Sequence, residues 1–145
     1  MIRTFLMVML FASPLAAFAA GESVRLYKTP NCTCCEAYAD YLRDHDFRVE
    51  VIPTHDLSAI KAEQGVPGDL AGCHTSLIAG YVFEGHIPVD SVRQVLDDRP
   101  DTAGISVPGM PVGSPGMGIE QGLSEPLRVY DLDGDIYATY QRIPQ

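Results

Sequence analysis

The sequence predicts a single domain of the α/β (α+β) class, with helices covering both faces of a mixed sheet to make three layers. Short alternating apolar runs are typical of strands, two segments carry apolar residues at helical spacing, and two turn signals join strands into hairpins. The length of 145 residues fits one ordinary domain. A hydrophobic fraction of 46% with 20% charged residues is enough to bury a core.

The first part of the chain predicts a strand, a helix and a second strand. Residues 24–27 form the first strand pattern. The helix has apolar positions at i, i+3, i+4 and i+7 over residues 38–45. Thr33 with Glu36 matches a capping box, which would make Thr33 the N-cap of this helix. Residues 47–52 alternate in polarity and predict the second strand.

The middle of the chain predicts a short helix, a hairpin and a longer helix. The short helix lies within residues 56–65, between a capping aspartate and a terminating glycine. Residues 75–84 predict a hairpin whose two-residue loop is Ala79-Gly80. Apolar residues at helical spacing then predict a helix within residues 90–99.

A long segment and a second hairpin complete the domain. Residues 104–126 are rich in glycine and proline and show no pattern of secondary structure. A loop of this length in a compact domain is more often functional or disordered. Residues 127–141 predict a C-terminal β-hairpin. The element order over residues 22–145 is thioredoxin-like, with this loop and hairpin as an extra C-terminal part.

Residues 1–19 have the features of a secretory signal peptide. Arg3 precedes a short apolar run, and small residues allow cleavage after Ala19 or Ala20. Cleavage changes the formal net charge from −9 to −10, because only Arg3 is lost. Such acidity excludes nucleic acid as a partner, since phosphates require a basic face. No other apolar run approaches a membrane span, so we expect an exported, soluble mature protein.

The cysteines and two histidines converge at one edge of the predicted sheet. Three cysteines surround the start of the first helix, which follows the carboxyl end of the first strand. The third strand begins at this edge and the fourth ends there. With Ala79-Gly80 as the turn, paired residue numbers sum to 159, so Cys73 faces His86. The predicted cluster consists of Cys32, Cys34, Cys35, Cys73, His74 and His86.

Both methionines of the mature chain lie in a repeated Pro-Gly-Met tripeptide. Met110 and Met117 each end one copy, within the loop rich in proline and glycine. Thioethers are soft ligands suited to Cu(I), so both side chains are candidate ligands. Hydrophobic contacts that tether the loop are the alternative role for these two residues.

The cysteine spacing allows several chemistries. Cys32 and Cys35 form a C-x-x-C motif, which permits dithiol–disulfide exchange and makes them the redox candidates. A simple oxidoreductase does not need Cys34 between them. Cys34 and Cys35, being adjacent, cannot easily bind one tetrahedral ion together, whereas differently aimed thiolates suit several bridged Cu(I) ions.

Three other uses of the cysteines are alternatives to copper binding. Zinc could be held by Cys32, Cys35, Cys73 and a histidine. Two ordinary disulfides would also suit an exported domain, although three cysteines within four residues make that geometry awkward. An iron–sulfur cluster is disfavoured because the C-x-C-C spacing matches neither common ferredoxin pattern.

The mature chain also resembles a known family. The matching stretches are residues 27–35 (YKTPNCTCC), 73–75 (CHT), 80–88 (GYVFEGHIP) and 107–117 (VPGMPVGSPGM). On these stretches it resembles the family long catalogued as a domain of unknown function, to which the bacterial CopG copper-resistance proteins belong. The resemblance implies a thioredoxin-like periplasmic protein that binds copper through its cysteines and acts in copper tolerance. The implied metal ligands are Cys32, Cys34, Cys35 and Cys73, and, less directly, Met110, Met117, His74 and His86.

The sequence therefore predicts a periplasmic protein of copper resistance or homeostasis. It would hold several Cu(I) ions at a cysteine-bridged site, with cycling between Cu(I) and Cu(II) as an implied activity. Its expected partners are copper ions and other periplasmic copper-handling or redox proteins. The alternatives are a thiol–disulfide oxidoreductase using Cys32 and Cys35 and a passive copper chaperone. The sequence leaves open whether the chain is an enzyme.

Overall fold

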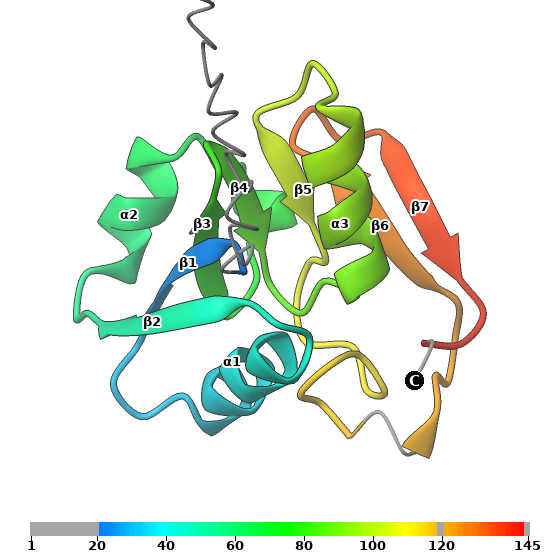
Figure 1. The fold of residues 1–145 in the computed structure, drawn as a ribbon, viewed down its shortest axis with the longest axis horizontal. Coiled ribbons are helices and arrows are strands. Elements are labelled where there is room, and N and C mark those ends of the chain that lie inside the picture. The colour runs from blue at the N-terminus through cyan, green and yellow to red at the C-terminus, as the bar shows by residue number, and fades with distance from the viewer. Residues whose placement is uncertain (1–20, 119–120, 144–145) are drawn as a thin grey trace, which may run out of the picture.

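The computed structural model describes residues 21–118 and 121–143 (Figure 1). The predicted signal peptide, residues 1–19, lies outside the described residues. The elements are β1 (Ser23–Lys28), α1 (Thr33–Asp44), β2 (Arg48–Pro53), α2 (Leu57–Glu63), the 3-10 helix η1 (Gly68–Leu70), β3 (His74–Ile78), β4 (Tyr81–Glu84), α3 (Val89–Asp98), β5 (Gly104–Ser106), β6 (Leu127–Asp131) and β7 (Ile136–Tyr140). Within these described residues, no helix is long and apolar enough to cross a membrane.

The strands form one mixed sheet of seven strands in the order β2-β1-β3-β4-β5-β6-β7. β1 and β2 are parallel and joined by α1, whereas β3 is antiparallel to both β1 and β4. These strands contain the β-α-β unit and the β-β-α unit that the element order predicts. The predicted mixed α/β class is confirmed.

The hairpin between β3 and β4 has the predicted register. Ile78 pairs with Tyr81 and Thr75 pairs with Glu84. Ala79 and Gly80 both have positive φ angles, 49° and 92°. Positive φ at both central residues is typical of the type I′ turn, whose twist matches that of paired strands. The turn therefore determines which residues meet at the opposite end of the hairpin.

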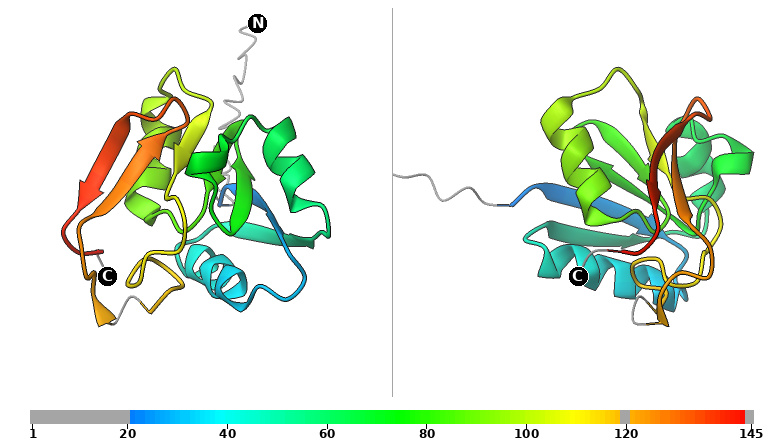
Figure 2. Two further views of the ribbon diagram at one scale, coloured as in Figure 1. Left: turned by 180° about the vertical axis from the view of Figure 1, so that it is seen from behind. Right: turned by 90° about the vertical axis from the view of Figure 1, so that its right-hand side faces the viewer.

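Helices cover both faces of the sheet (Figure 2). α1 and α3 pack on one face, where alternate residues of β1 meet the apolar stripes of both helices in the larger core cluster. α2 and η1 lie on the other face, where Leu70 and Val82 belong to a smaller cluster with Leu132. The carboxyl end of β1, the start of α1 and the start of β3 consequently lie at one edge, as expected.

Two local predictions are wrong. The N-cap of α1 is Cys32, which makes no side-chain capping bond, and Thr33 is the first helical residue rather than the cap. Residues 104–106, expected to be loop, form β5, which is parallel to β4 and antiparallel to β6. A three-residue strand gives almost no local signal, because its hydrogen bonds come from partners distant in sequence. β5 joins the C-terminal hairpin to the main sheet.

Candidate metal centre

The start of α1 presents three cysteines at the edge of the sheet. Cys32 caps the helix, Cys34 and Cys35 lie in its first turn, and Cys35 points into the core. Cys32 and Cys35 form a disulfide with their Cα atoms 5.4 Å apart. Cys34 and Cys73 are free thiols. The structure therefore shows the C-x-x-C pair in its oxidised form.

Cys73 closes this group from the loop that precedes β3. Its Sγ lies 4.0 Å from Sγ of Cys34, which lies 3.5 Å from Sγ of Cys32. Sγ of Cys35 lies 3.6 Å from the backbone oxygen of Cys73. All four sulfur atoms are within 4.8 Å of one another. The structure thus brings together the four cysteines that the sequence predicts to converge.

Two buried histidines meet Cys73 from the other side. Sγ of Cys73 lies 2.9 Å from Nε2 of His86 and 3.4 Å from Nδ1 of His74. The hairpin register therefore places Cys73 against His86 as expected. The ring of Tyr38 packs on both imidazoles, with centroid distances of 4.6 Å to His74 and 5.4 Å to His86. Its hydroxyl donates to the backbone oxygen of Ile87, which ties α1 to the segment after β4.

Burial controls the protonation of these groups. Desolvation, with a further contribution from the Cys34 thiol, raises the pKa of Cys73 to about 12. Cys73 is consequently a neutral thiol near pH 7, and a metal ion that binds it must displace a proton. Desolvation lowers the pKa of both His74 and His86, which keeps the imidazoles neutral and their lone pairs available.

The metal-free chain is expected to lose stability as the pH falls below about 6.5, the ordinary pKa of histidine. The unfolded chain binds protons at His74 and His86 there, whereas the folded chain, with both pKa values lowered, does not until the pH is lower. Each histidine contributes up to about 1.4 kcal/mol per pH unit in this window. Urea unfolding between about pH 7.5 and 5.5 measures the slope. His74→Gln should reduce this slope, and an unchanged slope in His74→Gln would refute the prediction.

Lys28 fixes the loop before the cysteines, a role that the sequence analysis missed. Its ammonium donates to the backbone oxygens of Thr29 and Pro30, at 3.2 and 3.0 Å, and pairs with Glu36 at 3.0 Å. The side chain is almost fully buried. Lys28 lies on the inward face of β1, because it continues the alternation of Val24 and Leu26. This alternation was the signal in the sequence that predicts a buried side chain at Lys28.

Glu84 holds the backbone next to Cys73 and was also missed. Its carboxylate is fully buried, forms an ion pair with Lys61, and accepts hydrogen bonds from Gly72 N–H and the Thr75 hydroxyl, each at 2.7 Å. Gly72 directly precedes Cys73, so this network positions the peptide that carries the thiol. The predicted pairing of Thr75 with Glu84 was the signal available in the sequence.

The loop with the repeated Pro-Gly-Met tripeptide packs beside the site. Gly109 N–H donates to the backbone oxygen of Ala71 at 3.1 Å, near Cys73. Gly116 has φ +75°, and a Cβ there would lie 2.7 Å from Tyr38 N and 3.1 Å from the Cys34 oxygen. Only glycine allows this close approach of the loop to α1.

The two methionines themselves differ in exposure. Met110 is 57% exposed and Met117 is half-buried. The structure thus brings the backbone of both tripeptides to the site. The ligand role of the two thioethers stays a prediction.

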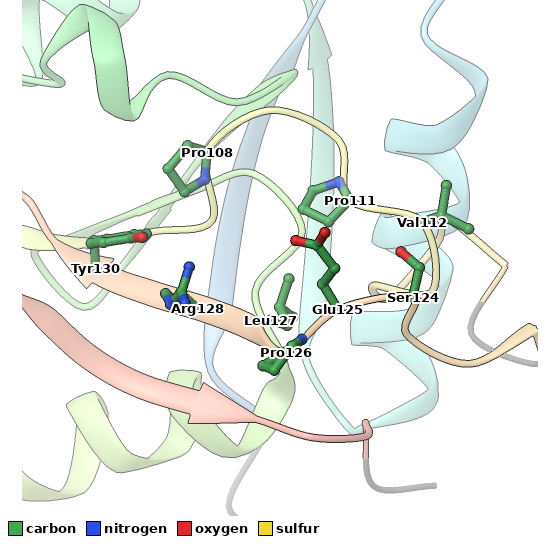
Figure 3. A pocket seen from close by; sticks show the side chains of 9 residues that line it. All are labelled: Pro108, Pro111, Val112, Ser124, Glu125, Pro126, Leu127, Arg128 and Tyr130. Carbon is green, nitrogen blue, oxygen red and sulfur yellow. The ribbon is translucent and has the colours of Figure 1, made fainter.

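An open pocket of about 380 Å³ lies between the start of this loop and β6 (Figure 3). Its lining includes Pro108, Pro111 and Val112 from the loop and Arg128 and Tyr130 from β6. None of the predicted metal ligands lines it. The candidate site is therefore the cysteine–histidine cluster and not this pocket.

The donor set determines which metals the cluster can take. Thiolate sulfur and neutral imidazole nitrogen suit soft and borderline ions such as Cu(I), Cu(II) and Zn²⁺, whereas Mg²⁺ and Ca²⁺ prefer oxygen. While the disulfide is closed, only Cys34 and Cys73 can become thiolates. Reduction of the disulfide gives four thiols, so that all four cysteine sulfurs are available as metal ligands.

A family model and two solved structures are similar to this chain. Residues 70–117, which include Cys73, His74, His86 and both Pro-Gly-Met tripeptides, match the model of a protein family of unknown function, DUF411. No curated protein matches the chain significantly in sequence. Two solved structures of copper resistance protein CopG are similar, both at 34% identity. Form 2 has a TM-score of 0.75 over 83% of this chain and 98% of its own, and Form 1 has 0.74 over 81% and 96%.

Proposed function

This chain belongs to the family of the CopG copper-resistance proteins, and we propose that it is a periplasmic protein that holds Cu(I) in copper resistance. The observation that carries the proposal is the convergence of four cysteine sulfurs within 4.8 Å at the start of α1. Thiolates so close together can bridge several Cu(I) ions, because thiolate sulfur is a soft ligand that suits Cu(I). The signal-like pattern of residues 1–19 supports export to the periplasm.

Copper binding at this cluster requires the reduced protein. The Cys32–Cys35 disulfide must accept two electrons and two protons from a thiol reductant to become two thiols. Cu(I) then displaces the thiol protons as it binds. We therefore expect the copper content to depend on the redox state of this pair.

Anaerobic titration of the reduced chain with Cu(I) tests the proposal. The expected result is saturation at more than one copper ion per chain, with sulfur as the main scatterer in X-ray absorption at the copper edge. Saturation below one ion per chain would overturn the copper function. A parallel titration with Zn²⁺ measures whether zinc competes for the same thiolates.

A Cys34→Ser substitution separates the copper cluster from a simple dithiol enzyme. Sγ of Cys34 lies between those of Cys32 and Cys73, so its loss should reduce the number of bound Cu(I) ions by at least one. The stoichiometry is measured by copper analysis after removal of free metal. Unchanged stoichiometry in Cys34→Ser would contradict a bridged cluster.

The observed disulfide supports a second candidate, a thiol–disulfide oxidoreductase using Cys32 and Cys35. Such an enzyme should retain its turnover of a dithiol substrate in Cys34→Ser and lose it in Cys35→Ser. A passive chaperone differs from both because it would neither exchange disulfides nor oxidise added Cu(I) catalytically. Turnover assays with each substrate therefore distinguish the three.

A further inference from the structure

The four cysteines make two pairs, one bonded and one free. Cys32 and Cys35 share the disulfide, whereas Cys34 and Cys73 are free thiols whose Sγ atoms lie 4.0 Å apart. Sγ of Cys34 also lies 3.5 Å from Sγ of Cys32. One sulfur atom therefore contacts both the disulfide and the second free thiol. This contact gives Cys34 a use that involves no metal and that an exchange confined to Cys32 and Cys35 does not explain.

A bond between Cys34 and Cys73 requires only a small movement. Bonded sulfurs lie about 2.05 Å apart, so the gap to close is about 2 Å. Cys73 lies between η1 and β3, outside any helix or strand, and both thiols are half-buried. Cys35 is fully buried, and its Sγ lies against the backbone oxygen of Cys73 at 3.6 Å. Of the cysteines at the start of α1, Cys34 is thus the one whose free thiol contacts Cys73.

His86 provides an acceptor for the thiol proton of Cys73. Nδ1–H of His86 donates to the backbone oxygen of Pro115 at 2.6 Å, which leaves Nε2 unprotonated. This Nε2 lies 2.9 Å from Sγ of Cys73, within reach of its proton. A sulfur with a positioned base beside it is the usual arrangement of a cysteine nucleophile. The buried thiol can therefore give up its proton while it forms a bond.

From these contacts we infer that Cys34 transfers the disulfide from the C-x-x-C pair to Cys73 in the metal-free chain. The Cys34 thiolate first attacks Sγ of Cys32, so that the Cys32–Cys34 bond forms, the Cys32–Cys35 bond breaks, and Cys35 leaves with the electron pair and takes up a proton. Cys73 then gives its proton to His86 and attacks Cys34. The Cys34–Cys73 bond forms, and Cys32 leaves and takes up a proton. One disulfide and two thiols are conserved in number, so no external oxidant or reductant is consumed.

The transfer changes what the oxidised chain presents. The Cys32–Cys35 disulfide joins residues three apart, whereas the Cys34–Cys73 disulfide joins residues 39 apart and links α1 to the segment before β3. A bond that closes a longer loop restricts the unfolded chain more and stabilises the fold more. The transfer also returns the partly exposed Cys32 to the thiol form. Exchange with the disulfide of a partner protein, which is reduced to two thiols, then re-forms Cys32–Cys35 and leaves the chain with two disulfides.

Disulfide mapping of the metal-free wild-type chain tests the transfer. The chain with one disulfide and two thiols is equilibrated with a chelator near the ordinary thiol pKa of about 8.5, quenched with acid, alkylated and cut with trypsin without reduction. Trypsin places three cysteines in residues 29–43 and Cys73 in residues 62–93. The expected product is a disulfide-linked pair of these peptides, with alkyl groups on Cys32 and Cys35. The absence of this linked pair after equilibration would overturn the inference.

Two substitutions in the first turn of α1 make the mapping specific. Cys34→Ser keeps the C-x-x-C disulfide and the Cys73 thiol but lacks the sulfur between them, so the linked pair should be lost. Thr33→Ser, at an exposed neighbouring position, should give the wild-type yield. An undiminished yield in Cys34→Ser would show that Cys73 reaches the disulfide directly, which would refute the role of Cys34.

The double variant Cys32→Ser with Cys35→Ser tests the second bond alone. Glutathione disulfide, itself reduced to two glutathione molecules, should oxidise Cys34 and Cys73 to a disulfide and leave no free thiol. The oxidised double variant should unfold at a higher urea concentration than its reduced form, because the new bond closes a 39-residue separation. A stable mixed disulfide with glutathione at Cys34 or Cys73 would show that the two sulfurs cannot meet in the folded chain.

The transfer does not depend on copper, so the proposed function is judged separately. Several Cu(I) ions bound by the reduced chain, without the linked peptides in the oxidised chain, would refute the transfer and leave the proposed function standing. The linked peptides in the oxidised chain, with less than one Cu(I) bound by the reduced chain, would refute the copper function and leave the transfer standing.

Discussion

Replacing Cys73 by serine is expected to weaken Cu(I) binding by the reduced chain. Its Sγ lies 4.0 Å from Sγ of Cys34 and 2.9 Å from Nε2 of His86, so it joins the cysteine sulfurs to the imidazoles. Outer-shell substitutions already lower metal affinity by 10–100-fold, so losing this ligand should cost more than about 100-fold. Anaerobic competition with a chromophoric Cu(I) chelator measures the affinity of the reduced chain.

Cys34→Ser is the matched control for Cys73→Ser. Both substitutions exchange one half-buried free thiol for a hydroxyl, but only Cys73 contacts the imidazoles. Cys34→Ser should lose at least one bound Cu(I) ion, and Cys73→Ser, which also removes the sulfur next to both imidazoles, should show the larger loss of Cu(I) affinity. Wild-type Cu(I) affinity in Cys73→Ser would show that the cluster does not bind copper through this residue.

Replacing Glu84 by alanine is expected to lower the free energy of unfolding by about 3–5 kcal/mol. The substitution leaves the ammonium of Lys61, whose side chain is only 14% exposed, without its carboxylate partner. It also leaves the Gly72 N–H and the Thr75 hydroxyl without their acceptor. Urea unfolding measures the change by circular dichroism, because the chain contains no tryptophan.

Two further variants make the Glu84 experiment specific. Glu84→Gln keeps the side-chain volume and one oxygen acceptor, so its loss of stability should be smaller than that of Glu84→Ala. Asp40→Ala breaks the exposed i,i+3 pair with Arg43 and should cost only about 0.3 kcal/mol. If Glu84→Ala unfolds at the same urea concentration as Asp40→Ala, the buried network does not stabilise the fold as argued.

Glu84 also links stability to the metal centre. Its hydrogen bond from Gly72 N–H fixes the peptide that precedes Cys73. In Glu84→Gln we expect weaker Cu(I) binding even where the folded population remains full. Comparing the copper affinity of Glu84→Gln and Asp40→Ala under native conditions checks this positioning role.

The period of two in β-strands explains why the histidine contact was predictable. Once Ala79 and Gly80 are identified as the turn, every later pairing in the hairpin follows by counting, including Thr75 with Glu84. The same count, continued beyond the paired strands, places Cys73 opposite His86, and the structure shows this contact. Helical spacing likewise located α1, although the cap is Cys32 rather than Thr33.

Other features of the site depend on residues far apart in the chain. Nothing local indicates that Pro115 accepts from His86, 29 residues away, or that Lys61 of α2 pairs with Glu84. β5 also has no local signal in the sequence, because its three residues form a strand only by pairing with β4 and β6. Buried polar groups are positioned by the partners that satisfy them, and sequence periodicity does not report those partners.

The amino-acid sequence alone determined the fold class, the residues of the cluster and the edge of the sheet where they meet, because strand and helix periods are local properties. Only the tertiary structure decided that the C-x-x-C pair is closed as a disulfide and that Sγ of Cys73 lies against both the Cys34 thiol and the two imidazoles. The contacts of Cys73 depend on distances of 2.9–4.0 Å between side chains from different elements. Packing of α1, the hairpin and the loop with the Pro-Gly-Met tripeptides against one another sets such distances.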